Sequence, residues 1–131
     1  MRMHYRLLVT TGQARSSLDA RTAARLLLPP LGFVIDETQL WPGGIADWFV
    51  IGGRFTGSLA GISDAEWESR DHGAILGYED DAQLITAELY DRLLAQQEEW
   101  PDSGHYADLE RTPLSRKFIG WKWLVVVDYH R

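Results

Sequence analysis

The closing segment GWKWLVVVDYHR (120–131) constrains the fold more than any other part of the chain. Alternate residues from Trp121 to Tyr129 share one face, which is the period of a β-strand. The opening segment HYRLLVTT (4–11) alternates in the same way. Because both segments are strongly apolar, we expect them to lie side by side in the centre of one sheet.

Two segments between these strands carry the pattern of a helix N-cap. The segment SSLDARTAARLLLPP (16–30) has a serine three residues before Asp19, continues with good helix formers and stops at two prolines. The segment SDAEWES (63–69) has Ser63 and Glu66 at the same spacing, so we expect a short helix there.

The segment DDAQLITAELYDRLLAQQEEW (80–100) has the clearest helical pattern in the chain. Asp80 and Asp81 suit the positive N-terminal end of a helix, and Pro101 would end it. Apolar residues recur at three- and four-residue spacing, namely Ala82, Ile85, Leu89 and Leu93. We therefore predict one long helix over this segment.

The other segments predict short strands and loops. Residues 31–44 suggest a short strand with a loop, and residues 47–59 suggest a strand, an interruption and a second strand. Residues 74–78 suggest a short strand, and residues 101–118 a polar connection. A chain of 131 residues has the size of one domain. The order of elements predicts a single α+β domain over residues 1–131, with helices packed on a mostly antiparallel sheet.

The segment DWFVIGGRFTG (47–57) places two adjacent glycines where a strand should continue. Glycine reaches backbone angles closed to other residues, so Gly52 and Gly53 predict a bulge or bend in the strand. The same bend could form an anion-binding nest of amides, with Arg54 clamping a phosphate or carboxylate. The spacing matches neither a Walker loop nor a dinucleotide fingerprint. A structural bend and a ligand site both remain open.

The chain has six tryptophans, most of which we expect in the core. Trp41 lies in a predicted loop, and Trp48 lies in the strand that leads to the glycine pair. Either indole could stack on a base, and Trp41 could instead anchor a partner protein. Together with the Gly52-Gly53-Arg54 loop, these indoles form a candidate site for a nucleotide or another small ligand.

The net charge of −6 is unevenly distributed along the chain. Residues 60–110 hold 14 Asp and Glu residues against two arginines. One interpretation is a solvated helix with its loops; the other is an acidic surface that docks a basic partner or mimics a nucleic-acid backbone. In the second interpretation, Asp80, Asp81 and Glu88 are the candidate docking residues. The acidic balance argues against direct binding of nucleic acid.

A third candidate site lies near the two ends of the chain. Asp128 and His130 are two residues apart in the last predicted strand, so they lie on the same side of it. If the first and last strands pair, His4 could converge with them. Two histidines and a carboxylate suit a divalent metal or a histidine base oriented by an aspartate. The alternative is a sheet end whose polar groups are solvated or hydrogen-bonded.

The absence of cysteine excludes disulfides, thiol catalysis and cysteine-ligated metals, and it fits a reducing cytoplasm. The longest apolar run, WLVVV, is far shorter than a membrane span, and the opening segment is too short and too polar for a signal peptide. We therefore expect a cytoplasmic protein without a membrane partner, and no pattern predicts a bound cofactor.

Three segments together resemble an uncharacterised family of small proteins encoded mostly by phages and prophages of high-GC bacteria. The segments are the opening strand, the glycine–arginine segment and the closing strand, which contribute His4, Asp47, Trp48, Gly52, Gly53, Arg54, Gly57, Asp128 and His130. Phe55 stands where the family usually has tryptophan, and Tyr129 where it has cysteine. The acidic region 60–100 does not align. The resemblance implies a genomic setting, a mobile element, rather than a mechanism.

Three functional hypotheses follow from these observations. The leading one is a non-enzymatic phage- or prophage-type accessory protein that docks its acidic surface on a host macromolecule, either a protein or a protein–nucleic-acid complex, such as a defence component. The second is a small-ligand or nucleotide-binding protein that uses Gly52, Gly53 and Arg54. The third is a metal-dependent hydrolase that uses His4, Asp128 and His130.

Overall fold

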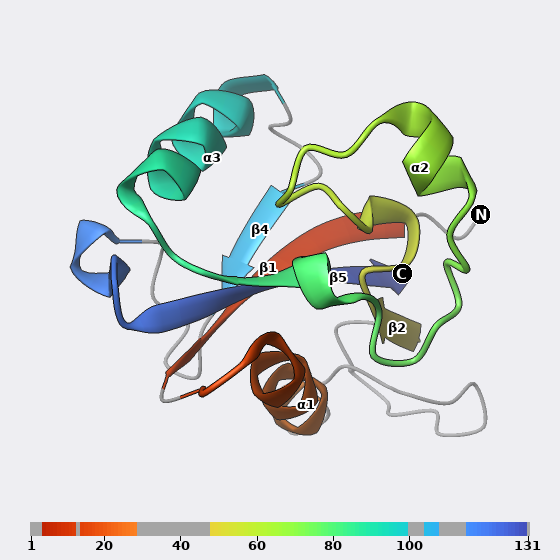
Figure 1. Cartoon of the computed structure of the whole chain (residues 1–131), viewed down its shortest axis with the longest axis horizontal. Coiled ribbons are helices and arrows are strands. Elements are labelled where there is room, and N and C mark those ends of the chain that lie inside the picture. The colour runs from red at the N-terminus through yellow and green to blue at the C-terminus, as the bar shows by residue number, and fades with distance from the viewer. Residues whose placement is uncertain (1–3, 13, 29–47, 100–103, 108–114, 131) are drawn as a thin grey trace.

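The computed structural model describes residues 4–12, 14–28, 48–99, 104–107 and 115–130, which form a sheet between two helical layers (Figure 1). The strands are β1 (His4–Gly12), β2 (Trp48–Ile51), β3 (Ala82–Leu84), β4 (Gly104–Ala107) and β5 (Lys122–His130). The α-helices are α1 (Ser17–Leu27), α2 (Asp64–Glu68) and α3 (Ala87–Glu99). The short 3-10 helices are η2 (Gly53–Phe55), η3 (Glu79–Asp81) and η4 (Arg116–Phe118).

The two terminal strands form the centre of the sheet, as predicted. β5 pairs antiparallel with β1 along nine residues of each strand. On its other side β5 pairs antiparallel with β2 near its end and with β3 near its start. β1 also pairs with β4, and this pairing is parallel. The prediction of an α+β domain with a mostly antiparallel sheet is therefore confirmed.

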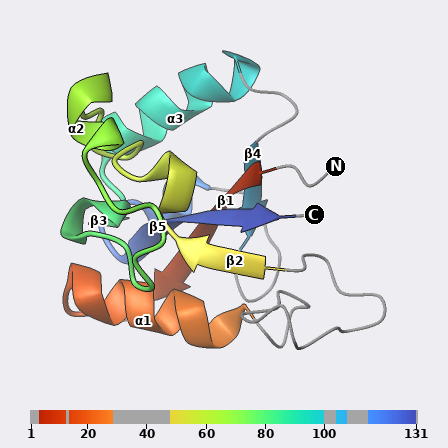
Figure 2. The ribbon, with the colours of Figure 1, turned by 90° about the vertical axis from the view of Figure 1, so that its right-hand side faces the viewer.

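The alternation of the central strands produces one core on each face of the sheet, because successive side chains point to opposite faces. The first core lies under α1 and includes Leu7, Val9, Ala20, Ala24, Leu28, Val125 and Val127. The second core lies under α3 and includes Leu8, Leu59, Leu89, Leu93, Phe118, Leu124 and Val126. Figure 2 shows α1 on one side of the sheet, with α2 and α3 on the other.

The two predicted N-caps are confirmed. The Ser16 hydroxyl accepts a hydrogen bond from the amide of Asp19 at 3.2 Å, at the start of α1. The Ser63 hydroxyl accepts from the amide of Glu66 at 3.3 Å, at the start of α2. Each bond satisfies an amide that the first helical turn leaves without a backbone acceptor.

The predicted long helix over 80–100 is wrong in its first third, because α3 begins only at Ala87. The preceding residues form η3 and then β3, which pairs with β5. The amide of Ile85 still donates to the Lys122 carbonyl of β5, at 3.0 Å. The helix can start only after that bond, and the Thr86 hydroxyl accepts from the amide of Leu89 at 3.1 Å. Asp80 and Asp81 therefore lie in η3 and not at the N-terminus of α3.

Four other segment predictions need correction or fall on residues that the structure does not describe. No second strand follows the glycine pair, since residues 53–61 form η2 and turns, and residues 74–78 form turns instead of a strand. The predicted connection over 101–118 contains β4 and η4. The predicted strand and loop at 31–44 lie outside the described residues. Within the described part of the chain, no helix is long and apolar enough to cross a membrane.

Candidate functional site

A cavity of about 520 Å³ opens beside the glycine–arginine segment, on the face of the sheet that carries α2 and α3. Its wall includes η2 with the turn that follows, α2, and one side chain from β1. The lining residues are Arg6, Arg54, Phe55, Thr56, Gly57, Ser58, Gly61, Ile62, Asp64 and Trp67. The predicted ligand segment therefore borders a real cavity, which we call the arginine cavity.

The glycine pair turns the chain off the sheet and toward this cavity. The amide of Gly52 still donates to the Val126 carbonyl of β5, at 2.8 Å, and the chain then leaves the strand. Gly52 and Gly53 have φ angles of 76° and 53°, a region that favours glycine. This bend exposes Arg54 at the cavity. The two interpretations of the pair are thus compatible, because the bend itself brings the arginine to the cavity.

The Asp128 carboxylate fixes this bend from beneath. It is 1 % exposed, and its Oδ2 accepts a hydrogen bond from the amide of Arg54 at 3.0 Å. A Cβ on Gly53 would lie 2.6 Å from the Cβ of Asp128, so only glycine fits above it. The register places Arg6 directly opposite Asp128, on the same face. Arg6 is 3 % exposed and lines the cavity.

A second carboxylate, Asp81, supports the turn that follows Arg54. The residue is 0 % exposed. Its Oδ1 accepts from the amide of Gly57 at 2.8 Å, its Oδ2 accepts from the amide of Tyr78 at 2.8 Å, and the Thr56 hydroxyl donates to the same carboxylate. Burial raises the pKa of Asp81 above the ordinary 3.8, although these hydrogen bonds oppose the shift.

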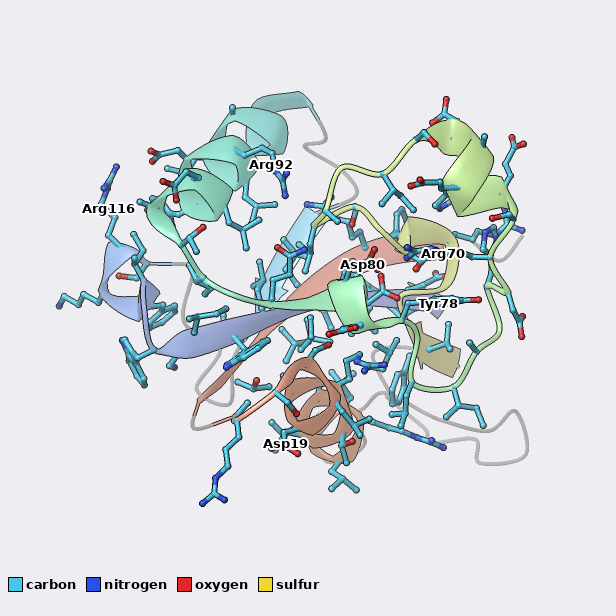
Figure 3. All side chains as sticks on the ribbon, viewed as in Figure 1. Asp19, Arg70, Tyr78, Asp80, Arg92 and Arg116 are labelled. Carbon is cyan, nitrogen blue, oxygen red and sulfur yellow. The ribbon has the colours of Figure 1, made fainter. Side chains whose placement is uncertain are left out.

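Arg70, in the segment after α2, binds the residue next to Asp81 and also the Thr56 hydroxyl (Figure 3). Its guanidinium makes two hydrogen bonds of 2.6 Å to Asp80 and one of 3.0 Å to the Thr56 hydroxyl. It also lies 4.7 Å from the centre of the Tyr78 ring. The hydrogen bond to Asp80 raises the pKa of Arg70, so this arginine stays charged. Arg70 therefore connects three segments behind the cavity wall.

Trp67 forms the part of the wall that α2 contributes. Its indole N–H donates to the Arg54 carbonyl at 2.6 Å, which ties α2 to the glycine–arginine segment. Its ring centre lies 4.5 Å from that of His72. Most tryptophans are expected in the core from the sequence, and no motif singles out Trp67. The only local signal was its position in a short capped helix close to the glycine segment.

The other predicted ligand residues are placed only in part. Trp41 lies outside the described residues, and Trp48 is described only as a backbone position in β2. The register pairs His4 with His130 and puts both on the face that carries Asp128. The side chains of the two histidines lie outside the described part. Among the described residues, no group of three His, Cys, Asp or Glu side chains could hold a metal ion.

The predicted docking residues do not form one acidic surface. Asp81 is buried, which contradicts its predicted place on an exposed face. Its carboxylate is instead surrounded by the backbone donors that bind it. Asp80 is bound by Arg70, and only Glu88 is exposed, on the first turn of α3.

No protein-family model, curated protein or solved structure matches this chain.

Proposed function

We propose that this chain is a small-molecule-binding protein and that the arginine cavity is its binding site. The observation that carries the proposal is that two arginines, Arg6 and Arg54, and two aromatic residues, Phe55 and Trp67, line the same cavity. The volume of about 520 Å³ falls within the range of sites for small organic ligands.

The residues that line the cavity favour a ligand with an anionic group and a flat apolar body. Guanidinium groups bind carboxylate and phosphate with paired hydrogen bonds. Because Arg6 is almost fully buried, a ligand anion near it would interact in a medium of low dielectric constant. Asp64 also lines the cavity and would repel a second anionic group. A mononucleotide or an aromatic acid fits this pattern better than a nucleoside triphosphate.

Calorimetric titration with three matched probes tests this proposal. We expect phenyl phosphate to bind. Phenol, which lacks the anionic group, and inorganic phosphate, which lacks the aromatic ring, should each bind more weakly. Arg54→Ala should weaken phenyl phosphate binding about tenfold, the loss of a charged hydrogen-bonding partner. Arg116→Ala is the control, because this exposed arginine lies at the opposite end of the molecule (Figure 3). Equal binding by the two variants would contradict the assignment of Arg54.

A second candidate function is docking of a host macromolecule by a cytoplasmic phage- or prophage-type accessory protein. The observation that favours it is a series of exposed acidic side chains along the chain from α2 into α3, namely Asp64, Glu66, Glu68, Asp71, Glu79, Glu88 and Asp91. Exposed carboxylates suit a basic partner. This candidate no longer includes Asp81, whose carboxylate is not accessible to a partner.

A further inference from the structure

We propose that Asp81 is the positioning residue of the arginine cavity: its buried carboxylate holds the wall formed by Thr56 and Gly57 in the shape that binds the ligand. This inference rests on the proposed binding function. Asp81 does not line the cavity itself, whereas Thr56 and Gly57, which it binds, both do. Its effect on a ligand would therefore act entirely through the wall.

The wall depends on Asp81 because the carboxylate anchors the backbone of Gly57 under the Ile62 side chain. Gly57 has a φ of 78°, and a Cβ at this position would overlap the side chain of Ile62, another lining residue. Ile62 thus packs directly over the backbone of Gly57. The hydrogen bond from the Gly57 amide to Asp81 also holds that backbone, at 2.8 Å. The amides of Ala60, Gly61 and Ile62 also hold Gly57, through its carbonyl. Loss of the bond to Asp81 would leave the Gly57 amide without its acceptor and loosen the contact with Ile62.

The arrangement requires a carboxylate rather than an amide. Each oxygen of Asp81 accepts from a different backbone N–H, Oδ1 from Gly57 and Oδ2 from Tyr78. An asparagine would have to turn its NH2 group toward one of these donors, so one backbone N–H would lose its acceptor. Hydrogen bonds to a charged acceptor are also stronger than neutral ones. Asp81→Asn is therefore nearly isosteric but removes the function of the carboxylate.

Among the described residues, the charged groups that interact with Asp81 are Asp80 and Arg70. Asp80 precedes it and is bound to Arg70, which also reaches Thr56. Tyr78 contributes its backbone amide to Asp81, and its hydroxyl accepts from the amide of Asp71 at 2.8 Å. From the wall itself, the groups that reach the carboxylate are the Thr56 hydroxyl and the Gly57 amide, neither of which titrates.

The first test uses the native chain and needs no ligand. Nuclear magnetic resonance can follow the carboxyl carbon of Asp81 and the amides of Gly57 and Tyr78 as the pH is lowered. We expect the two amides to shift with the same midpoint as the carboxyl carbon, since protonation weakens both hydrogen bonds. If the amide shifts of Gly57 and Tyr78 do not follow the titration of the Asp81 carboxyl carbon, the proposal is overturned, even if no variant at this position folds.

The second test compares Asp81→Asn with Asp91→Asn, a control at an exposed aspartate of α3. In Asp81→Asn, amide exchange at Gly57 should accelerate at least about tenfold while exchange at Val126 in β5 stays unchanged. Phenyl phosphate affinity should fall in parallel. Unchanged exchange at Gly57 would overturn the role of Asp81 whatever the chain binds. Failure of the native chain to bind phenyl phosphate, with accelerated exchange in the variant, would instead count against the proposed binding function and the ligand-positioning role that depends on it.

Discussion

The carboxylate of Asp81 occupies the space that a side chain at residue 52 would need. A Cβ on Gly52 would overlap Oδ2 of Asp81 and lie 2.9 Å from its Cγ. Gly77 also faces this carboxylate, and a Cβ on Gly77 would lie 2.6 Å from Oδ2 of Asp81. The first glycine of the pair in DWFVIGGRFTG is therefore required by a buried acid from a distant segment as well as by the bend.

Gly52→Ala should destabilise the chain much more than Gly120→Ala. Both glycines have positive φ angles, 76° and 87°, but a Cβ on Gly120 would meet nothing within 4 Å. Gly120→Ala therefore measures the cost of a positive φ at an open position, about 1–2 kcal/mol. Gly52→Ala adds a steric clash with Asp81, so we expect at least about 3 kcal/mol. Urea unfolding measures both, and equal losses would show that Asp81 does not fill this space.

The free energy of unfolding should depend on pH through Asp81. Because burial raises its pKa in the folded chain, the folded state keeps a proton that the unfolded state has already released. The stabilisation is complete below pH 3.8, the ordinary value, and is lost as the pH rises through the folded-state pKa. Unfolding measured across this window should show the decline in the native chain. Asp81→Asn should remove that part of the decline; an identical pH profile in the variant would contradict the assignment.

Arg70→Lys should not behave as a conservative change. The guanidinium binds both oxygens of Asp80 and also the Thr56 hydroxyl, a fork that a single ammonium group cannot reproduce. We expect a loss of about 1–3 kcal/mol in the free energy of unfolding, because both partners are only partly exposed. Arg116→Lys, at an exposed ion pair with Asp91, should leave unfolding unchanged. A loss of similar size in both variants would argue against the fork.

Charge-reversal variants can distinguish an effect on folding from an effect on docking through the exposed acidic side chains. Asp81→Lys should unfold or severely destabilise the chain, since it buries an ammonium group among backbone donors. Glu66→Lys, Glu68→Lys and Glu88→Lys, all at exposed positions, should together leave the fold intact. Loss of a basic partner in this triple variant would support docking through these side chains. If partner binding persists in the folded triple variant, that candidate function is wrong.

The parts of the fold that depend on local sequence could be predicted. The alternation in the two terminal strands is local, and so is the spacing of Ser16 to Asp19 and of Ser63 to Glu66; the structure confirms each. The start of α3 could not be predicted in this way. Ala82 and Ile85 have helical spacing, but they belong to the two different cores, and only the pairing of β3 with β5 determines this.

The candidate site was predictable only where one short segment carries it. The glycine pair indicated a bend that presents Arg54, and the structure places Arg54 at a cavity. Arg6 and Trp67 come from other segments. No local pattern indicated Arg6, and the only local signal for Trp67 was its place in a short capped helix. Asp81 was assigned to the surface because it follows another acid before a helical pattern. Its partner Gly57 is 24 residues away in sequence, so no local pattern could reveal the contact.

The most direct test of the binding function is a nuclear magnetic resonance titration of the native chain with phenyl phosphate. We predict that the backbone amides of Arg54, Gly57 and Gly61 and the indole N–H of Trp67 shift together and saturate, while the amide of Glu88 does not move. This result would place the ligand in the arginine cavity. Shifts that cluster elsewhere, or none up to the solubility limit of the probe, would contradict the account.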